Sequence, residues 1–115
     1  MRTVYTLLLL LATTFAGAQE FALKQLEASP RHQEWVNVEY GGRKVRAFVV
    51  FPEVSAKATS VIVIHENRGL NDWARAMADQ IAGEGFIAIA PDLLSGMAPN
   101  GGNTADFPTG DAARD

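Results

Sequence analysis

Two neighbouring segments of the chain alternate between apolar and polar residues. The alternation runs through residues 35–40 and again through residues 44–51. A period of two residues is typical of β-strands that bury one face and leave the other partly wet. The pair Gly41-Gly42 lies between them and supplies the positive φ values of a tight turn. The pattern therefore predicts an antiparallel β-hairpin.

A different pattern follows the hairpin. Residues 61–64 form a continuous β-branched run without alternation, which is typical of a strand buried on both faces in a parallel sheet. Apolar residues then recur at three- and four-residue steps through 71–84, after Asn71 as a suitable N-cap. Gly85 fits the left-handed position just past the helix end. Residues 86–90 form a second apolar strand, so the order predicts a right-handed βαβ crossover.

The first eighteen residues are typical of a signal peptide. Arg2 gives a positive start, residues 4–12 are largely apolar, and residues 16–18 read Ala-Gly-Ala, which signal peptidase accepts. The apolar run is shorter than the roughly 20 residues of a membrane span. We expect cleavage before Gln19, a periplasmic or secreted protein, and no membrane association after cleavage.

Length and composition allow one domain at most, because the chain has 115 residues. We divide it into the signal peptide, an arm or short helix over residues 19–34, and a partial domain over residues 35–115. The net charge is −3 and no basic run occurs, so we expect no nucleic-acid partner. The chain has no Cys, and we expect no cofactor and no metal. Residues 95–110 are rich in Gly, Pro, Asn and Thr, which predicts a long surface loop. We expect residues 111–115 to begin a helix.

The candidate chemistry lies after the two predicted parallel strands. Residues 65–69 read His-Glu-Asn-Arg-Gly, and residues 92–95 read Asp-Leu-Leu-Ser. Open α/β sheets bind ligands at the carboxyl ends of their strands. A glycine-flanked turn in front of a helix can also aim a backbone N–H at a developing oxyanion.

At these residues the chain resembles the dienelactone hydrolase family. The resemblance rests on Val-Ile-Val-Ile-His-Glu-Asn-Arg-Gly-Leu-Asn at residues 61–71 and on Gly-Phe-Ile-Ala-Ile-Ala-Pro-Asp-Leu at residues 85–93. It extends over residues 35–115, including the hairpin. It implies an α/β fold class, with the N-terminal half of an α/β-hydrolase fold and an incomplete sheet. The strand at residues 61–64 would then lack its next parallel neighbour.

The resemblance also implies roles for the loop after the first parallel strand. Glu66 would lie beside the nucleophile and take part in activating it, and Asn67 would donate its backbone N–H to the oxyanion hole. The alternative for Glu66 is a solvent-exposed carboxylate that caps the following helix. Arg68 could pair with Glu66 or reach a substrate carboxylate, with a solvated surface charge as the alternative. Arg114 is the only candidate for the family's substrate-binding arginines.

Three further polar residues favour structural roles. His65 does not begin a His-Glu-x-x-His zinc motif, because residue 69 is glycine, and we expect a hydrogen-bonded structural histidine. We expect Asp92 to fix its loop by accepting backbone N–H bonds. A local triad of Ser95, Asp92 and His65 is an alternative, although Ser95 lacks the Gly-x-Ser-x-Gly elbow.

The sequence contains no nucleophile motif, since it has neither Cys nor an elbow. We therefore expect a fragment of an exported hydrolase that acts on a small-molecule ester or lactone through a cysteine or serine encoded beyond this chain. The 115-residue chain alone is predicted to be inactive. One alternative is a non-catalytic exported binding module built on half of the fold. Another is a metal-dependent hydrolase that uses His65, Glu66 and Asp92.

Overall fold

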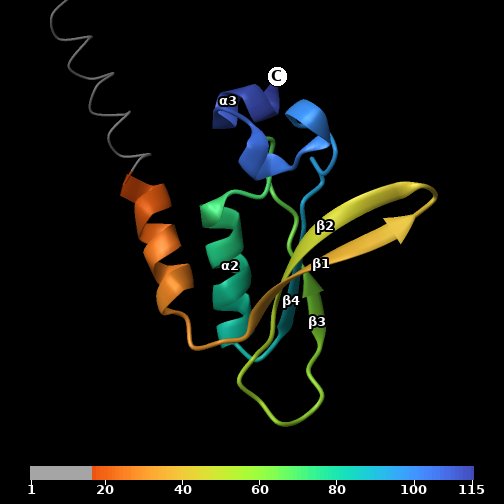
Figure 1. Ribbon diagram of the computed structural model, residues 1–115. Helices are drawn as coiled ribbons and strands as arrows, with labels where there is room; N and C mark the ends of the chain where they lie inside the picture. Colours follow the sequence, from red (N-terminus) through yellow and green to blue (C-terminus); the bar gives the residue numbers. More distant parts are fainter. Residues whose placement is uncertain (1–16) are drawn as a thin grey trace, which may run out of the picture.

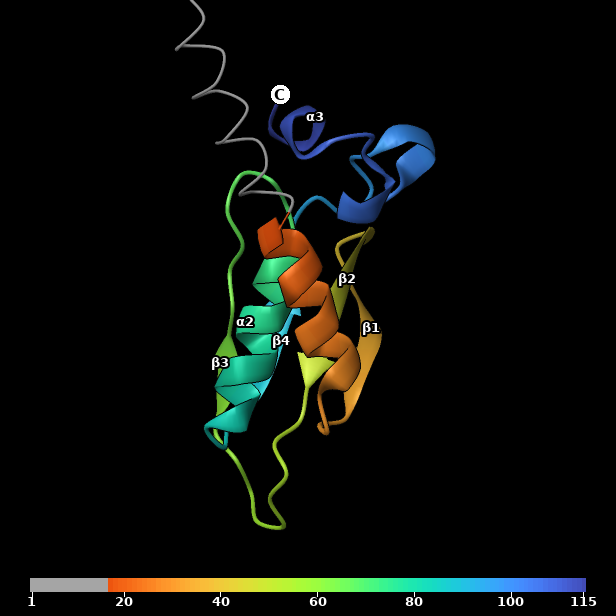
Figure 2. The ribbon, with the colours of Figure 1, turned by 90° about the vertical axis from the view of Figure 1, so that its left-hand side faces the viewer.

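The computed structural model describes residues 17–115, so the predicted signal peptide lies outside the described residues except for its last two positions. Two helices pack on one face of a four-stranded mixed sheet, and an irregular C-terminal segment lies beyond one end of the strands (Figures 1 and 2). The elements are a helix over residues 17–28, β1 (Gln33–Tyr40), β2 (Arg43–Val50), β3 (Ser60–Ile62), α2 (Asp72–Gly83), β4 (Ile87–Pro91), 3₁₀ turns η1 (Pro99–Gly101) and η2 (Thr104–Asp106), and α3 (Gly110–Arg114).

The sheet has the order β1-β2-β4-β3, and only β3 and β4 run parallel. The predicted hairpin is confirmed, because Tyr40 pairs with Arg43 across a two-residue turn. Gly41 and Gly42 in that turn have φ values of 57° and 76°, which match the right-handed twist of the paired strands. The α/β fold class is confirmed as well, since a mixed sheet with helices fits part of an α/β-hydrolase fold.

The strand β3 lies at the edge of the sheet. Within residues 17–115 it pairs only with β4, and no helix covers its second face. Ile62 and Ile64 are therefore 65% and 71% exposed, whereas Val63 packs against the core under the helices. The prediction that residues 61–64 are buried on both faces is wrong for this structure. The expectation of an incomplete sheet, with β3 unpaired on one side, agrees with it.

The helix α2 begins and ends where the sequence predicts. The side chain of Asn71 accepts a hydrogen bond from the Ala74 N–H at 3.0 Å, which caps the first turn. At the other end, the Gly85 N–H donates to the Ala82 carbonyl at 3.0 Å, and Gly85 has a φ of 95°. A residue with a Cβ rarely adopts this left-handed conformation, so glycine ends the helix here.

Small residues dominate the layer between the helices and the sheet. Both helices contribute to one core cluster with β2 and β4, and alanine is its commonest residue. The segment after the predicted cleavage site, expected as an arm or short helix, is a helix that packs beside α2 (Figure 2). No helix within residues 17–115 is long and apolar enough to span a membrane. The buried members of the cluster are Ala22, Leu26, Phe48, Val50, Leu70, Ala74, Ala76, Ala78, Ala82, Ala88 and Ala90.

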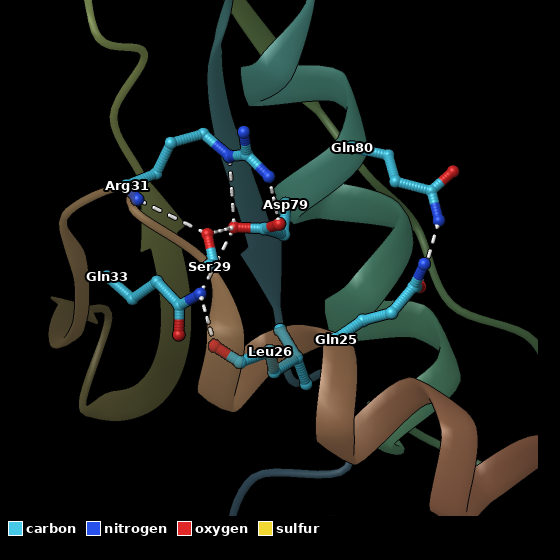
Figure 3. A network of polar contacts seen from close by, with 7 residues as sticks. All are labelled: Gln25, Leu26, Ser29, Arg31, Gln33, Asp79 and Gln80. Carbon is cyan, nitrogen blue, oxygen red and sulfur yellow. Dashed lines mark hydrogen bonds and ion pairs between the residues drawn. The ribbon is translucent and has the colours of Figure 1, made fainter.

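A buried carboxylate ties the segment after the N-terminal helix to α2 (Figure 3). Asp79 is 4% exposed and accepts hydrogen bonds from the Ser29 hydroxyl at 2.5 Å, from the Gln33 amide at 3.1 Å and from the Arg31 guanidinium. Burial alone would raise the pKa of Asp79. The bonds from Arg31, Ser29 and Gln33 outweigh burial and hold this pKa below its ordinary value.

Candidate functional site

The two loops that follow β3 and β4 meet at the carboxyl end of the parallel strand pair, beside the C-terminal segment (Figure 1). Gly69 in the first loop lies very close to Leu94 of the second loop and to Thr104 of the C-terminal segment. It has a φ of 80°, and a Cβ at this position would lie 2.7 Å from Thr104 Cγ2 and 2.9 Å from Leu94 Cδ1. Only glycine fits this combination of backbone conformation and contact.

Thr104 links the two loops through its hydroxyl group. Its Oγ1 donates to Asp92 Oδ1 at 2.7 Å and accepts from the Leu70 N–H at 3.0 Å. The Asp92 carboxylate, from a residue that is 2% exposed, also accepts from the backbone N–H groups of Leu94 and Thr104. The prediction that Asp92 fixes its loop by accepting backbone N–H bonds is confirmed. A partly buried chain of hydrogen bonds thus holds the end of the first loop in place.

The residues before Gly69 form a turn with a free donor. The Gly69 N–H donates to the Glu66 carbonyl at 3.1 Å, which closes the turn over Asn67 and Arg68. Asn67 is an exposed residue, and its backbone N–H has no acceptor within residues 17–115. A backbone N–H that is held by its neighbours and has no acceptor is the kind of group that can stabilise an oxyanion.

The Glu66 carboxylate is exposed and lines a cavity of 260 Å³ together with Gln19 and Trp73. It makes no hydrogen bond within the described residues. The side chain that caps α2 belongs to Asn71 instead. A carboxylate in this position can orient or deprotonate a neighbouring group without first breaking an ion pair.

His65 joins the same two loops from the other side of the turn. Its Nε2 accepts from the Leu93 N–H at 3.0 Å, and its Nδ1 lies 2.6 Å from the Glu66 carbonyl. A carbonyl can only accept and a backbone N–H can only donate, so both bonds form only with neutral histidine protonated on Nδ1. His65 is therefore a structural residue, as the sequence predicts.

The alternative triad of Ser95, Asp92 and His65 does not form. The Ser95 hydroxyl donates to the Asp92 carbonyl at 2.5 Å and accepts from the Arg46 N–H at 3.0 Å. Ser95 is 6% exposed, so its oxygen is both occupied and buried. A metal site is not assembled either, since residues 17–115 hold no group of three potential His, Asp or Glu ligands.

Residues 45–113 match the family model described as the dienelactone hydrolase family. This chain belongs to that family. The matched range includes the turn at Glu66, the Asp92–Thr104 contact and the helix α2 between them. The resemblance drawn from the loop sequences is thereby confirmed. The chain is a member of a hydrolase family of the dienelactone hydrolase type.

Three curated proteins are similar to this family member. The "Putative hydrolase fragment YghX" of Escherichia coli (strain K12) is 44% identical over 64 residues, which cover 55% of this chain and 55% of YghX. A "Putative carboxymethylenebutenolidase" of Saccharolobus solfataricus is 48% identical over 54 residues, which cover 47% of this chain and 20% of that protein. A protein of the same name from Aquifex aeolicus is 36% identical over 67 residues, covering 56% and 28%. The chain thus spans no more than about half the length of these relatives.

Arg68 forms its ion pair with Asp111 and not with Glu66. Its Nη2 lies 3.2 Å from Asp111 Oδ1, and its side chain runs beside Gly110 at the start of α3. The loop arginine thus connects the candidate site to the C-terminal helix. Arg114 pairs with Asp111 and Asp115 at the surface of this dienelactone hydrolase family member.

Sequence reasoning missed Thr104, which the structure makes the central support of the site. It lies 34 residues after Leu70, within a stretch of Gly, Asn, Thr and Pro that predicts only a surface loop. The sequence offered one indirect signal for such a residue. Asp92 was expected to accept hydrogen bonds from several N–H groups, and some of these donors had to come from another segment.

Proposed function

We propose that this family member is the N-terminal part of an exported hydrolase. The hydrolase cleaves ester or lactone bonds of a small-molecule substrate through a cysteine or serine that lies outside these 115 residues. The observation that carries the proposal is the free Asn67 N–H, in a turn held by Gly69 and Thr104 at the carboxyl end of β3. Acyl transfer needs such a fixed donor where negative charge develops.

Each part of the turn supports one requirement of that chemistry. Asn67 offers the backbone donor, and Thr104 with Asp92 keeps the loop from moving away from the reacting carbonyl. The unpaired Glu66 carboxylate, next to the donor, would take part in activating the nucleophile. General acid–base assistance of this kind contributes on the order of 10²–10⁴-fold in rate.

The nucleophile has to come from elsewhere. The sequence has no Cys, and the Ser95 hydroxyl is buried in two hydrogen bonds. We therefore expect the isolated 115-residue chain to hydrolyse no ester above a denatured-protein control. Hydrolysis that Ser95→Ala abolishes would contradict this expectation.

Reading the gene downstream of codon 115 tests the proposal most directly. A frame that continues into Gly-x-Cys-x-Gly or Gly-x-Ser-x-Gly supports the hydrolase. In the complete enzyme, Glu66→Gln should lower kcat by about 10²-fold with little change in stability. Glu39→Gln is the matched control, because Glu39 is exposed and lines neither cavity beside the candidate turn. A stop codon after Asp115 in independent isolates, with no hydrolysis by the chain, would favour a non-catalytic binding module instead.

Export is the second part of the proposal and has its own test. Mass spectrometry of the periplasmic or secreted protein should find Gln19 at the N-terminus. Replacing the small residue before it, Ala18→Leu, should block processing. A wild-type protein from that compartment that still begins with Met1 would contradict the export proposal. The hydrolase proposal would be unaffected.

A further inference from the structure

A second, larger cavity lies beside the candidate site and shares only part of its wall with it. Its volume is 740 Å³, within the roughly 300–1,000 Å³ of small-molecule pockets. The hairpin, the start of α2 and the C-terminal segment contribute most of its lining, and the cavity is open to solvent on one side. Neither Glu66 nor Asn67 lines it, so it is a separate space from the one beside the Glu66 carboxylate.

One cation in this wall is not neutralised. The guanidinium carbon of Arg46 lies 4.0 Å from the centroid of the Trp35 ring, and within residues 17–115 no carboxylate pairs with it. Stacking on an indole favours a cation but leaves the N–H groups at the edge of the guanidinium without acceptors. Arg46 is only partly exposed, so these donors are incompletely hydrated.

The acidic groups of the same wall are already engaged. Asp72 forms an ion pair with Arg75, and the Asp92 carboxylate accepts three hydrogen bonds from Leu94 and Thr104. Neither carboxylate pairs with Arg46, so the donors of its guanidinium remain available to a ligand in the cavity. Phe107 adds an apolar surface to the cavity.

We propose that this cavity binds a small organic monocarboxylate. The carboxylate lies on the free edge of the Arg46 guanidinium, where two parallel N–H···O bonds match its geometry. The apolar body of the ligand occupies the space towards Phe107. The assignment rests on the cavity and on Arg46, and it is independent of the hydrolase proposal.

The experiment titrates the whole chain with benzoate and with benzyl alcohol, which has a similar ring but no charge. The Trp35 indole N–H resonance reports the cavity, and the Trp73 indole reports the space beside Glu66. We expect saturable shifts at Trp35 with benzoate and at least about tenfold weaker binding of benzyl alcohol, since charge-assisted hydrogen bonds favour the anion.

Two variants separate recognition from general electrostatics. Arg46→Gln should weaken benzoate binding at least about tenfold. Arg43→Gln is the matched control, because Arg43 lies three residues away on the same strand and outside the cavity, and it should bind as the wild type does. Circular dichroism checks that both variants fold.

Several outcomes would overturn the proposal. They are the absence of saturable benzoate binding to the wild type, equal binding of benzyl alcohol, or shifts at Trp73 instead of Trp35. Unchanged affinity in folded Arg46→Gln, or equal losses in both arginine variants, would overturn it too. If Arg46→Gln does not fold, the wild-type comparison of the two ligands and the two indole signals decides the question by itself.

Discussion

Replacing Asp79 by alanine tests whether the N-terminal helix is held to the domain by a buried ionic contact. The substitution removes the one acceptor shared by Ser29, Arg31 and Gln33. All three donors then face a cavity where the carboxylate was. Because Asp79 comes from α2 and the donors come from the segment after the N-terminal helix, the change loosens the packing between the two elements (Figure 3).

The magnitude follows from burial. The side chains of Arg31 and Asp79 are 19% and 5% exposed. Removing one partner of a buried ion pair costs about 3–5 kcal/mol. Since the Arg31 guanidinium keeps some contact with water and can be rehydrated, we expect the lower end, about 3 kcal/mol. With a urea m-value of about 1–3 kcal/mol/M, the unfolding midpoint should fall by about 1–3 M.

Urea unfolding of wild type, Asp79→Ala, Arg31→Met and the double variant measures the contact as a thermodynamic cycle. The matched control is Glu20→Ala. It removes an exposed pair with Lys24, whose two side chains are 70% and 68% exposed, and should cost less than about 0.5 kcal/mol. A coupling free energy between Asp79 and Arg31 below about 0.5 kcal/mol would refute the reasoning, as would equal losses from Asp79→Ala and Glu20→Ala.

The same contact predicts a pH dependence with a defined sign. The pKa of Asp79 in the folded state lies below its ordinary value, so the unfolded chain binds more protons at Asp79 than the folded one in acid. The stability that the carboxylate contributes is fully present above its unfolded pKa of about 3.9. It is lost as the pH falls through the lower folded pKa. The difference in unfolding free energy between wild type and Asp79→Ala should therefore shrink in acid, and a difference that grew would contradict the assignment.

Three further predictions concern the loops and the sheet edge. Gly69→Ala should destabilise the protein more than Gly96→Ala, because both glycines have positive φ but only at Gly69 does a Cβ meet Thr104; equal unfolding midpoints would contradict this. Ile62→Lys should reduce self-association in light scattering, since it places a charge on the open edge strand, whereas Val54→Lys in the loop before β3 should have little effect. Nitrogen-15 NMR should show His65 protonated on Nδ1, and a predominant Nε2–H form would contradict the two loop contacts.

Local patterns were sufficient to predict the hairpin and α2. Gly41-Gly42 and Asn71 act on their immediate neighbours, so the turn and the helix start follow from a few adjacent residues. The position of the candidate turn after β3 was predictable for the same reason. The roles assigned to Glu66 and Asn67 rest on family resemblance and remain predictions.

Long-range contacts were not predictable from the same patterns. A β-branched run such as residues 61–64 suits a strand buried on both faces, but its exposure depends on which elements cover it. Asp79 reads as one polar position on a helix, and its partners lie 46 to 50 residues away. Thr104 carries no local signal for a hydrogen bond to the loop before α2.

The alanine-rich layer between the helices and the sheet has a consequence for how this protein tolerates mutation. Ala78, Ala88 and Ala90 are completely buried and belong to the core cluster between the helices and the sheet. A larger side chain there cannot move aside without lifting α2 from the sheet. In a saturation scan, such positions should accept glycine or serine better than leucine or valine. A ranking of these substitutions by hydrophobicity alone would place leucine and valine above glycine and serine. The order in the scan therefore shows whether space or polarity limits the side chains at these positions.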